Sequence, residues 1–497
     1  MNYINPILRG FHPDPSICRV GEDYYLVTSS FEYFPGIPLY HSRDLVNWKQ
    51  IGNCVDRISQ MPLSGTADSG GIWAPTIRYN DGTFYVTAFI LGKGNFIIST
   101  EDINGSWSDP VWIAMDGIDP SIYFEDGRAY YCTNAREHPD REEISMAEID
   151  IRTGRLKSGI KALWTGTGGG YMEAPHVYRI GEWYYLLTAE GGTDVNHTAT
   201  VARSRTLWGP YEGCPDNPIL TNRNDTSRNV QCAGHGDLFQ DQRGNWWMVH
   251  LGTRLSRRTM SYLGRETFLA PVRWEDGWPV VYEHGRALIS CDAPLWAAQQ
   301  ERKGLAFDFA DKEWEPQWLF LRQPDPSMYE RGGGRLRLHP APVSFESLTS
   351  PAMAVVIPLD FECRTETRCR FEPEKAGDEA GMILYLQSDF HYRICKRRTD
   401  RGDFVTVEKK AEDFIQTAYE AAVEKGDIRF RIDADKESFH FYYAVGDGPF
   451  QFACRVSTRF LSCEVAGRCF TGLLTGIYAL CEEKTGAAAD FYEFFMN

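Results

Sequence analysis

The sequence predicts an all-β protein in which a five-bladed β-propeller is followed by a β-sandwich. One pattern occurs five times: a start residue is followed, 10 or 11 positions later, by two adjacent aromatic residues. The start residues lie 60, 45, 54 and 62 positions apart, and an irregular repeat of this length with strand-like content is typical of propeller blades. Beyond the repeats, apolar and polar residues alternate strictly, which indicates the short antiparallel strands of a sandwich.

Each repeat has the order short strand, polar turn, aromatic strand, which is the signature of a β-hairpin. In the first repeat, the strand at 15–20 is followed by a turn at 21–23 and by the aromatic strand. We expect the aromatic pairs to pack the blades rather than to take part in function. The start residues and their pairs are Asp14 with Tyr24-Tyr25, Ala74 with Phe84-Tyr85, Asp119 with Tyr130-Tyr131, Glu173 with Tyr184-Tyr185, and His235 with Trp246-Trp247.

The start residues are expected to lie close together, because the innermost strands of a propeller run along its central channel. Asp14, Asp119 and Glu173 would then converge on the mouth of that channel. A single Asp-Pro step is more often a turn at the entry of a strand, since Asp and Pro favour turns. Three acids at equivalent positions of a repeat favour a functional site instead.

The repeat pattern ends near residue 281, and a polar segment with little strand pattern continues to residue 304. We therefore place the propeller at 1–295 and the sandwich at 305–497. Alternating runs in the second part lie at 335–338, 383–386, 428–432 and 439–442. The segment 408–424 is rich in Ala, Glu, Lys and Gln, and its composition leaves helix and strand open.

Composition excludes several classes of partner. A net charge of −16 argues against nucleic acids and anionic membranes, whose binding needs basic patches. The N-terminal segment has no basic stretch followed by an apolar one, so we expect no secretory signal, and no window reaches the length of a membrane helix. The 13 cysteines include no Cys-x-x-Cys pair, which favours reduced thiols and a cytoplasmic protein. The sequence leaves self-association open.

Three acids at one site suit glycoside hydrolysis, in which a protonated carboxyl and an ionised carboxylate flank the scissile bond. A third carboxylate can raise the pKa of the acid through its charge. Glu173 has the longer side chain, which suits reaching a leaving-group oxygen, whereas Asp14 and Asp119 are shorter. Competing signatures are absent: there is no His-Glu-x-x-His, no Gly-x-Ser-x-Gly, and the glycine cluster at 166–170 lacks the ending of a phosphate loop. We interpret that cluster as a flexible loop leading to Glu173.

Several motifs resemble glycoside hydrolase family 43, and in particular its two-domain β-xylosidase/α-L-arabinofuranosidase branch. The resemblance covers essentially the whole chain and implies an inverting enzyme on a five-bladed propeller. The motifs are Phe11-His12-Pro13-Asp14-Pro15-Ser16, 29–36, 42–48, Trp73-Ala74-Pro75, Gly264-Arg265-Glu266-Thr267, 274–279, and Phe470-Thr471-Gly472 with 476–478 and 489–491.

The resemblance assigns roles to particular residues. Asp14 would be the general base, Glu173 the general acid, and Asp119 the group that tunes the pKa and orientation of the acid. The substrate pocket would include Phe31, Trp73, Thr193, His235 and Arg265, and it would be closed by Phe470 from the second domain. The sequence departs from the family at Ala174, where Gly is common, and at 473–475.

Two of these assignments compete with simpler ones. His235 is equally well explained as a buried hydrogen-bonding residue, and Arg265 could pair with Glu266. No organic cofactor or direct metal site is expected, since the sequence lacks the carboxylate density of a calcium cage. The resemblance leaves room for a water-mediated structural calcium ion near His235.

Two functions of different classes remain. The first is an exo-glycosidase that releases xylose from short β-1,4-xylo-oligosaccharides, with α-L-arabinofuranosidase activity as a side activity or as the main one. The second is a carbohydrate-binding propeller without catalysis. Three acids in register favour the enzyme, because binding alone requires no such set.

Overall fold

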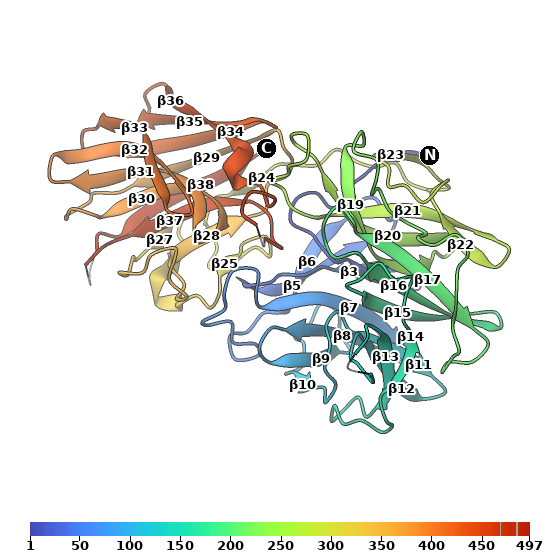
Figure 1. Ribbon diagram of the computed structural model, residues 1–497. Coiled ribbons are helices and arrows are strands. Elements are labelled where there is room, and N and C mark those ends of the chain that lie inside the picture. The colour runs from blue at the N-terminus through green and yellow to red at the C-terminus, as the bar shows by residue number, and fades with distance from the viewer. Residues whose placement is uncertain (139, 468, 484–485) are drawn as a thin grey trace.

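The computed structural model describes residues 1–138, 140–467, 469–483 and 486–497. In this part of the chain, the regular structure consists of β-strands and two short 3-10 helices, Pro326–Met328 (η1) and Thr458–Leu461 (η2). A ring of sheets lies beside a stack of two sheets (Figure 1), so the predicted order of propeller and sandwich is confirmed. None of the described helices has the length and apolar character needed to span a membrane.

The first part of the chain forms, within the described residues, five antiparallel sheets of four strands each. In chain order they are Ser16–Val20 (β2), Asp23–Val27 (β3), Gly36–Ser42 (β5) and Lys49–Val55 (β6); Ile72–Asn80 (β7), Thr83–Ile90 (β8), Gly94–Thr100 (β9) and Val111–Trp112 (β10); Ser121–Glu125 (β11), Arg128–Thr133 (β12), Ile144–Ile149 (β13) and Lys161–Trp164 (β14); Glu173–Ile180 (β15), Trp183–Glu190 (β16), Thr198–Ser204 (β17) and Glu212–Gly213 (β18); and Val230–Gln240 (β19), Trp246–Arg254 (β20), Glu266–Glu275 (β21) and Trp278–Val281 (β22).

The first strands of these sheets form a closed ring. β2 contacts β7, β7 contacts β11, β11 contacts β15, β15 contacts β19, and β19 contacts β2. The predicted hairpins are present, since each first strand pairs antiparallel with the aromatic strand that follows it. Glu173 begins β15, Asp14 and Asp119 lie two residues before β2 and β11, and Ala74 and His235 lie inside β7 and β19.

The aromatic pairs pack the blades against one another, as predicted. Rings from neighbouring sheets meet at all five junctions, with centroids 5.0 to 6.4 Å apart. Such edge-to-face and tilted contacts are favourable beyond the apolar area that they bury. The contacts are Tyr25 with Phe84, Tyr85 with Phe124, Tyr123 with Tyr184, Tyr185 with Trp274, and Tyr24 with Phe239.

The second part of the chain forms a sandwich of two antiparallel sheets. One consists of Ala352–Val356 (β28), Leu474–Leu480 (β37), Glu379–Gln387 (β30), Phe390–Thr399 (β31), Gly402–Ala411 (β32) and Phe414–Ala422 (β33), in this spatial order. The other consists of Tyr329–Arg331 (β26), Leu336–Leu338 (β27), Ala489–Met496 (β38), Cys363–Arg370 (β29), Ile428–Ala434 (β34), Ser438–Val445 (β35) and Gln451–Ser457 (β36), with Leu305–Phe307 (β24) paired to β38.

The segment 408–424, which the sequence left open, belongs to the hairpin of β32 and β33. β33 is the edge strand of its sheet, and most of its side chains are exposed or half-buried. Because solvent meets both faces of this strand, its residues lack the alternation that identifies a half-buried strand.

Short pairings join distant parts of the chain. Asn2–Ile4 (β1) pairs with Ser290–Asp292 (β23), and Tyr33–Phe34 (β4) of the propeller pairs with Phe320–Leu321 (β25) of the following part. One continuous hydrophobic cluster includes residues of the first two blades and of the sandwich. Buried Arg322 donates to the Thr66 carbonyl and pairs with Asp68 at 2.9 Å. The two domains are therefore packed together along a shared core.

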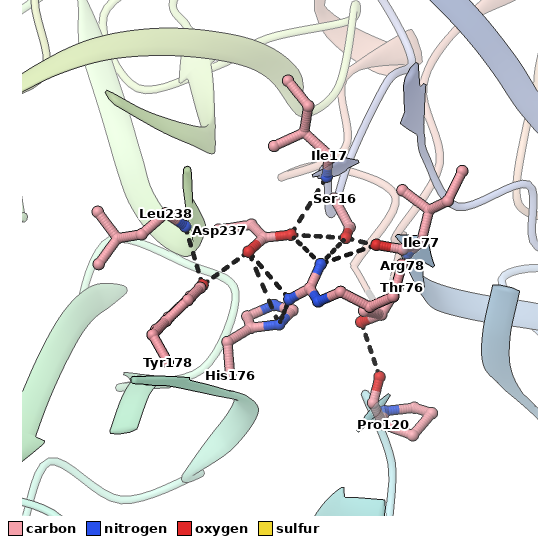
Figure 2. Close-up of polar contacts among 10 residues, drawn as sticks. All are labelled: Ser16, Ile17, Thr76, Ile77, Arg78, Pro120, His176, Tyr178, Asp237 and Leu238. Atoms are coloured by element: carbon pink, nitrogen blue, oxygen red, sulfur yellow. Dashed lines mark hydrogen bonds and ion pairs between the residues drawn. The ribbon is translucent and has the colours of Figure 1, made fainter. Parts of the chain in front are cut away.

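A buried ion pair lies between the inner strands (Figure 2). Both guanidinium nitrogens of Arg78 on β7 contact the carboxylate of Asp237 on β19, at 2.8 and 3.1 Å. The same carboxylate accepts hydrogen bonds from Ser16 on β2 at 2.7 Å and from Tyr178 on β15 at 2.6 Å. The Thr76 hydroxyl of β7 donates to the carbonyl of Pro120, next to β11, at 2.8 Å. Polar contacts thus connect all five inner strands.

The charges in this network are balanced. Burial alone would raise the pKa of Asp237, but the Arg78 guanidinium lowers it, so the pKa lies well below the usual range of an aspartate. The pKa of His176, whose Nδ1 lies 2.8 Å from Arg78, is lowered to about 3, chiefly by burial. Arg78 and Asp237 are therefore the charged members of the network at neutral pH.

Replacing Asp237 by Ala should destabilise the propeller strongly, because Arg78, whose side chain is only 18% exposed, would lose its counter-charge. Losing one partner of a buried ion pair costs about 3–5 kcal/mol. Guanidinium denaturation followed by tryptophan fluorescence measures the loss. Glu275→Ala is a matched control, since this residue on β21 forms an exposed pair with Arg273, worth at most about 1 kcal/mol. Similar losses in the two variants would show that the central network does not hold the ring.

Candidate active site

A cavity lies at one mouth of the propeller channel. All nine site residues predicted from the sequence line it, and Ile118 is the tenth. Eight of the nine come from the propeller, and the ninth, Phe470, comes from the sandwich. Ile118 escaped prediction because an apolar side chain beside an acid carries no chemical signal in the sequence. The nine are Asp14, Asp119, Glu173, Phe31, Trp73, Thr193, His235, Arg265 and Phe470.

The start residues have an unusual backbone conformation. Asp14, Asp119 and His235 lie in the left-handed region, with φ of 55°, 51° and 47°, a region in which Asp and His are enriched among non-glycine residues. In the fourth repeat the positive φ falls one position later, at Ala174 (52°). This explains why glycine would be favoured at position 174, and the register of β15 is irregular there, between Glu173 and His176.

Asp14 is held as a carboxylate by its neighbours. One of its oxygens accepts a hydrogen bond from Ser29 at 2.6 Å, and the other lies 2.6 Å from the Arg265 guanidinium. Burial raises the pKa of Asp14, but Arg265 and, to a smaller extent, His235 lower it. The resulting pKa lies below the usual value of an aspartate. Asp14 is thus ionised near neutral pH although it is buried.

Glu173 has the opposite tendency. It keeps some exposure toward the cavity, yet the atoms packed around its carboxyl remove it from water. This desolvation, followed by the charge of Asp14, raises the pKa of Glu173 to about 8. Desolvation, and then the charge of Glu173, raise the pKa of Asp119 well above its usual value. Asp119 and Glu173 interact strongly, so they share protons as a pair near neutral pH.

Arg265 connects the acids with both domains. Besides Asp14, it contacts the Thr193 hydroxyl at 3.1 Å and donates to the backbone carbonyl of Phe470 at 2.8 Å. It does not pair with Glu266, which is bound instead by Arg254 at 2.7 Å. Of the two roles that the sequence allowed for Arg265, the structure therefore supports the one directed into the cavity.

Aromatic rings form one wall of the cavity. The Phe470 ring centroid lies 6.2 Å from that of Phe31 and 5.7 Å from that of Trp73. The position of Phe470 is set by the propeller, because its backbone N–H donates to the Ser69 hydroxyl at 2.9 Å. The indole N–H of Trp73 donates to the Ser69 carbonyl at 3.1 Å. A rigid apolar wall opposite polar groups is typical of a small-molecule site.

His235 is buried, and its Nδ1 lies 3.7 Å from Asp14. Burial lowers the pKa of His235, so its ring is neutral near pH 7. Across 1–138, 140–467, 469–483 and 486–497, no group of three or more His, Cys, Asp or Glu side chains is placed to hold a metal ion. A water-mediated calcium ion beside His235 therefore stays a prediction, and no chemical step is assigned to it.

Two residues that sequence reasoning missed hold the segments that carry the acids. The Asn134 side chain accepts from the N–H of Ile118 at 2.8 Å and donates to the carbonyl of Met172 at 3.1 Å. It thereby connects the residue before Asp119 with the residue before Glu173. Asn134 follows the end of β12 and gave no signal in the sequence, since its role depends on two backbone groups distant in sequence.

The second such residue is Glu190, at the end of β16. Its buried carboxylate accepts hydrogen bonds from the N–H groups of Thr167 and Gly169, at 2.9 and 2.8 Å, and from the Thr200 hydroxyl at 2.9 Å. A Cβ added at Gly166 would lie 2.8 Å from a Glu190 oxygen, so glycine is required for this approach. The interpretation of 166–170 as a flexible loop was therefore wrong: its backbone is tied to Glu190.

Comparison with protein families identifies both parts of the chain. The model for glycosyl hydrolases family 43 matches residues 3–279, and the model for the β-xylosidase C-terminal concanavalin A-like domain matches residues 306–497. A non-reducing end α-L-arabinofuranosidase of Bacteroides ovatus is 37% identical over 96% of this chain and 90% of its own length. A xylosidase/arabinosidase of Butyrivibrio fibrisolvens is 36% identical over 99% of this chain and 98% of its own.

Solved structures agree with these relatives. A family 43 protein of Bacteroides ovatus whose name mentions xyloglucan superposes with a TM-score of 0.95, at 36% identity and complete coverage of both chains. A xylan β-1,4-xylosidase of Bacillus halodurans superposes with a TM-score of 0.93, at 33% identity over 99% of each chain.

Replacing Glu190 by Ala should release the loop at 166–170, because the N–H groups of Thr167 and Gly169 lose their acceptor. We expect faster amide hydrogen exchange in a peptide that covers this loop, measured by mass spectrometry. Glu182→Ala is the control, since Glu182 lies at the turn of the same hairpin and forms an exposed pair with Arg205. Unchanged exchange in Glu190→Ala would mean that the loop keeps its shape without this carboxylate.

Proposed function

The chain belongs to glycosyl hydrolase family 43 and is a glycoside hydrolase; from the geometry of its site, we propose that it is an inverting exo-glycosidase. It would release xylose from the non-reducing ends of short β-1,4-xylo-oligosaccharides and would also act on α-L-arabinofuranosides. The observation that carries the proposal is the opposite tuning of two carboxyls in one cavity. The pKa of Asp14 is lowered and that of Glu173 is raised to about 8, as a base and an acid for glycoside hydrolysis require.

The proposed reaction uses these two groups in one step. Glu173 donates its proton to the leaving-group oxygen as the bond from that oxygen to the anomeric carbon breaks. Asp14 accepts a proton from a water molecule that attacks the anomeric carbon from the opposite face. Asp119 assists by sharing protons with Glu173, so that the pair keeps a proton available for the leaving-group oxygen.

The ring of inner strands supports inversion. Asp14 precedes β2 and Glu173 begins β15, and these strands are not neighbours in the ring, since β19 lies between them. We therefore expect their carboxyls to face each other across the channel mouth. Inverting enzymes need a separation of about 6.5–9.5 Å to hold the attacking water, whereas retaining enzymes use about 5–5.5 Å.

The closed form of the cavity supports attack at a chain end. Phe31, Trp73 and Phe470 block one side of the cavity. A pocket closed in this way admits a terminal sugar, whereas an internal sugar of a long chain requires an open groove.

The choice between xylose and arabinose rests on the relatives. Those reported above are named for α-L-arabinofuranosidase, xylosidase/arabinosidase and xylan β-1,4-xylosidase activities. The two nitrophenyl glycosides, the β-xyloside and the α-L-arabinofuranoside, provide a direct comparison of the two activities in the purified protein. A mainly arabinofuranosidase function is the alternative, and a larger kcat/KM on the arabinofuranoside would favour it.

Hydrolysis of xylobiose by the wild-type protein should release α-xylose first, because the water attacks from the face opposite the leaving group. Proton NMR of the anomeric signals during the first turnovers, before mutarotation, distinguishes the two anomers. Early β-xylose would contradict inversion and would require new roles for Asp14 and Asp119. Asp14→Ala is the control, and we expect its rate to fall by about 10²–10⁴-fold, the usual contribution of a general base.

The pH dependence of kcat/KM should be bell-shaped. Asp14 must be ionised, so the rate falls on the acid side only below the usual pKa range of an aspartate. The Asp119–Glu173 pair must hold the proton of the acid, so the rate falls on the alkaline side near pH 8. Arg265→Met should move both limbs to higher pH, because the guanidinium lowers the pKa of Asp14 and that of Glu173.

A suitable control for this experiment is Arg179→Met, since Arg179 on β15 pairs with Glu125 at an exposed position. Its profile should match that of the wild type. If Arg265→Met lowers the rate but leaves both limbs in place, Arg265 contacts the substrate without tuning the acids.

A further inference from the structure

Tyr171 is the most exposed of the large apolar side chains in the described part of the chain, at 71%. It lies two positions before Glu173 and has a positive φ of 50°. A non-glycine residue in this region costs about 1–3 kcal/mol, and such strain persists only where the surroundings impose it. An isolated exposed aromatic residue needs no explanation by itself, but one held in a strained conformation beside a proposed acid does.

The backbone on both sides of Tyr171 is fixed. On the N-terminal side, Glu190 holds Thr167 and Gly169, and the Gly170 carbonyl accepts from the N–H of Gly191 at 2.8 Å. On the C-terminal side, Asn134 holds the carbonyl of Met172. The ring is thus presented to solvent by a segment with little freedom to move, so little entropy would be lost when a ligand covers it.

The ring lies next to the wall of the cavity. A Cβ added at Gly192 would meet the Tyr171 ring at 3.6 Å, which places the ring against the segment that leads into Thr193. Thr193 and Glu173 both line the cavity. The aromatic face therefore adjoins the part of the cavity wall that Glu173 and Thr193 form.

Taken together with the proposed function, these contacts point to a ligand. Glu173 protonates the oxygen that joins the terminal sugar to the rest of the substrate, so the leaving sugar must lie on the Glu173 side, just outside the cavity. We infer that Tyr171 forms the binding surface for this leaving sugar, with its ring against the apolar face of the pyranose. The loop at 166–172 then serves substrate selection as well as placement of the acid.

Xylobiose and β-xylosyl fluoride separate binding of the leaving sugar from a general loss of activity. Both place xylose in the cavity, but fluoride carries no sugar to contact Tyr171. Tyr171→Ala should lower kcat/KM for xylobiose about tenfold, mainly through KM, and should leave kcat/KM for the fluoride within about twofold of wild type; tenfold corresponds to about 1.4 kcal/mol. Tyr171→Phe should retain most of the activity on xylobiose, because the ring face remains.

The fluoride reaction reports whether the variant is folded and whether Asp14 is still placed. Hydrolysis of methyl β-xyloside, whose leaving group needs protonation but carries no sugar, reports whether Glu173 is still placed. A loss on methyl β-xyloside equal to that on xylobiose would overturn the inference, since it would mean that Tyr171 only shapes the loop that carries Glu173. No loss on xylobiose would overturn it as well. Val195→Ala is the matched control, because Val195 is an exposed apolar side chain, at 55%, on the adjoining loop, and it should change neither rate. Wild-type protein that leaves both substrates intact would instead contradict the proposed function.

Discussion

The site depends on the ion pair between Arg78 and Asp237. These two side chains, with their hydrogen-bond partners, connect β2, β7, β15 and β19 directly, and Thr76 extends the connection to β11. Asp14, Asp119 and Glu173 lie at the start of three of these strands, β2, β11 and β15, or within two residues of it. A shift of one inner strand along the channel would therefore change the separation between Asp14 and Glu173. Burying a charged pair costs free energy. Here the pair lies where strands distant in sequence must keep a fixed register.

Charge also differentiates the acids. Asp14, Asp119 and Glu173 are all surrounded by protein, and burial by itself would keep every one of them protonated. Arg265 reverses this for Asp14 alone, because its guanidinium lies 2.6 Å from that carboxylate. One arginine thereby converts three similar carboxyls into one ionised group and one pair that shares protons. The same arginine binds the Phe470 carbonyl, so the electrostatics of the cavity and its closure by the sandwich are coupled.

The propeller, the sandwich and the nine residues that line the cavity could be predicted from the sequence. The repeat shows which positions are equivalent, and the family motifs are specific. Glu190, Asn134 and Ile118 were not predicted. The first two act on backbone groups far away in sequence, and the third is an apolar side chain among charged ones. The strand at Phe414–Ala422 was left open because both of its faces meet solvent, which removes the alternation that reveals strands.

Phe470 follows Asp14 by more than 450 positions, yet it completes the wall around the acids. During synthesis, which proceeds from the N-terminus, the propeller segments and all three carboxyls emerge long before the residue that closes the cavity over them. The Arg265 contact with the Phe470 carbonyl can form only after most of the sandwich has been made. The cavity around the acids is therefore incomplete in the nascent propeller, and it is completed only when the segment with Phe470 has been synthesised and folded.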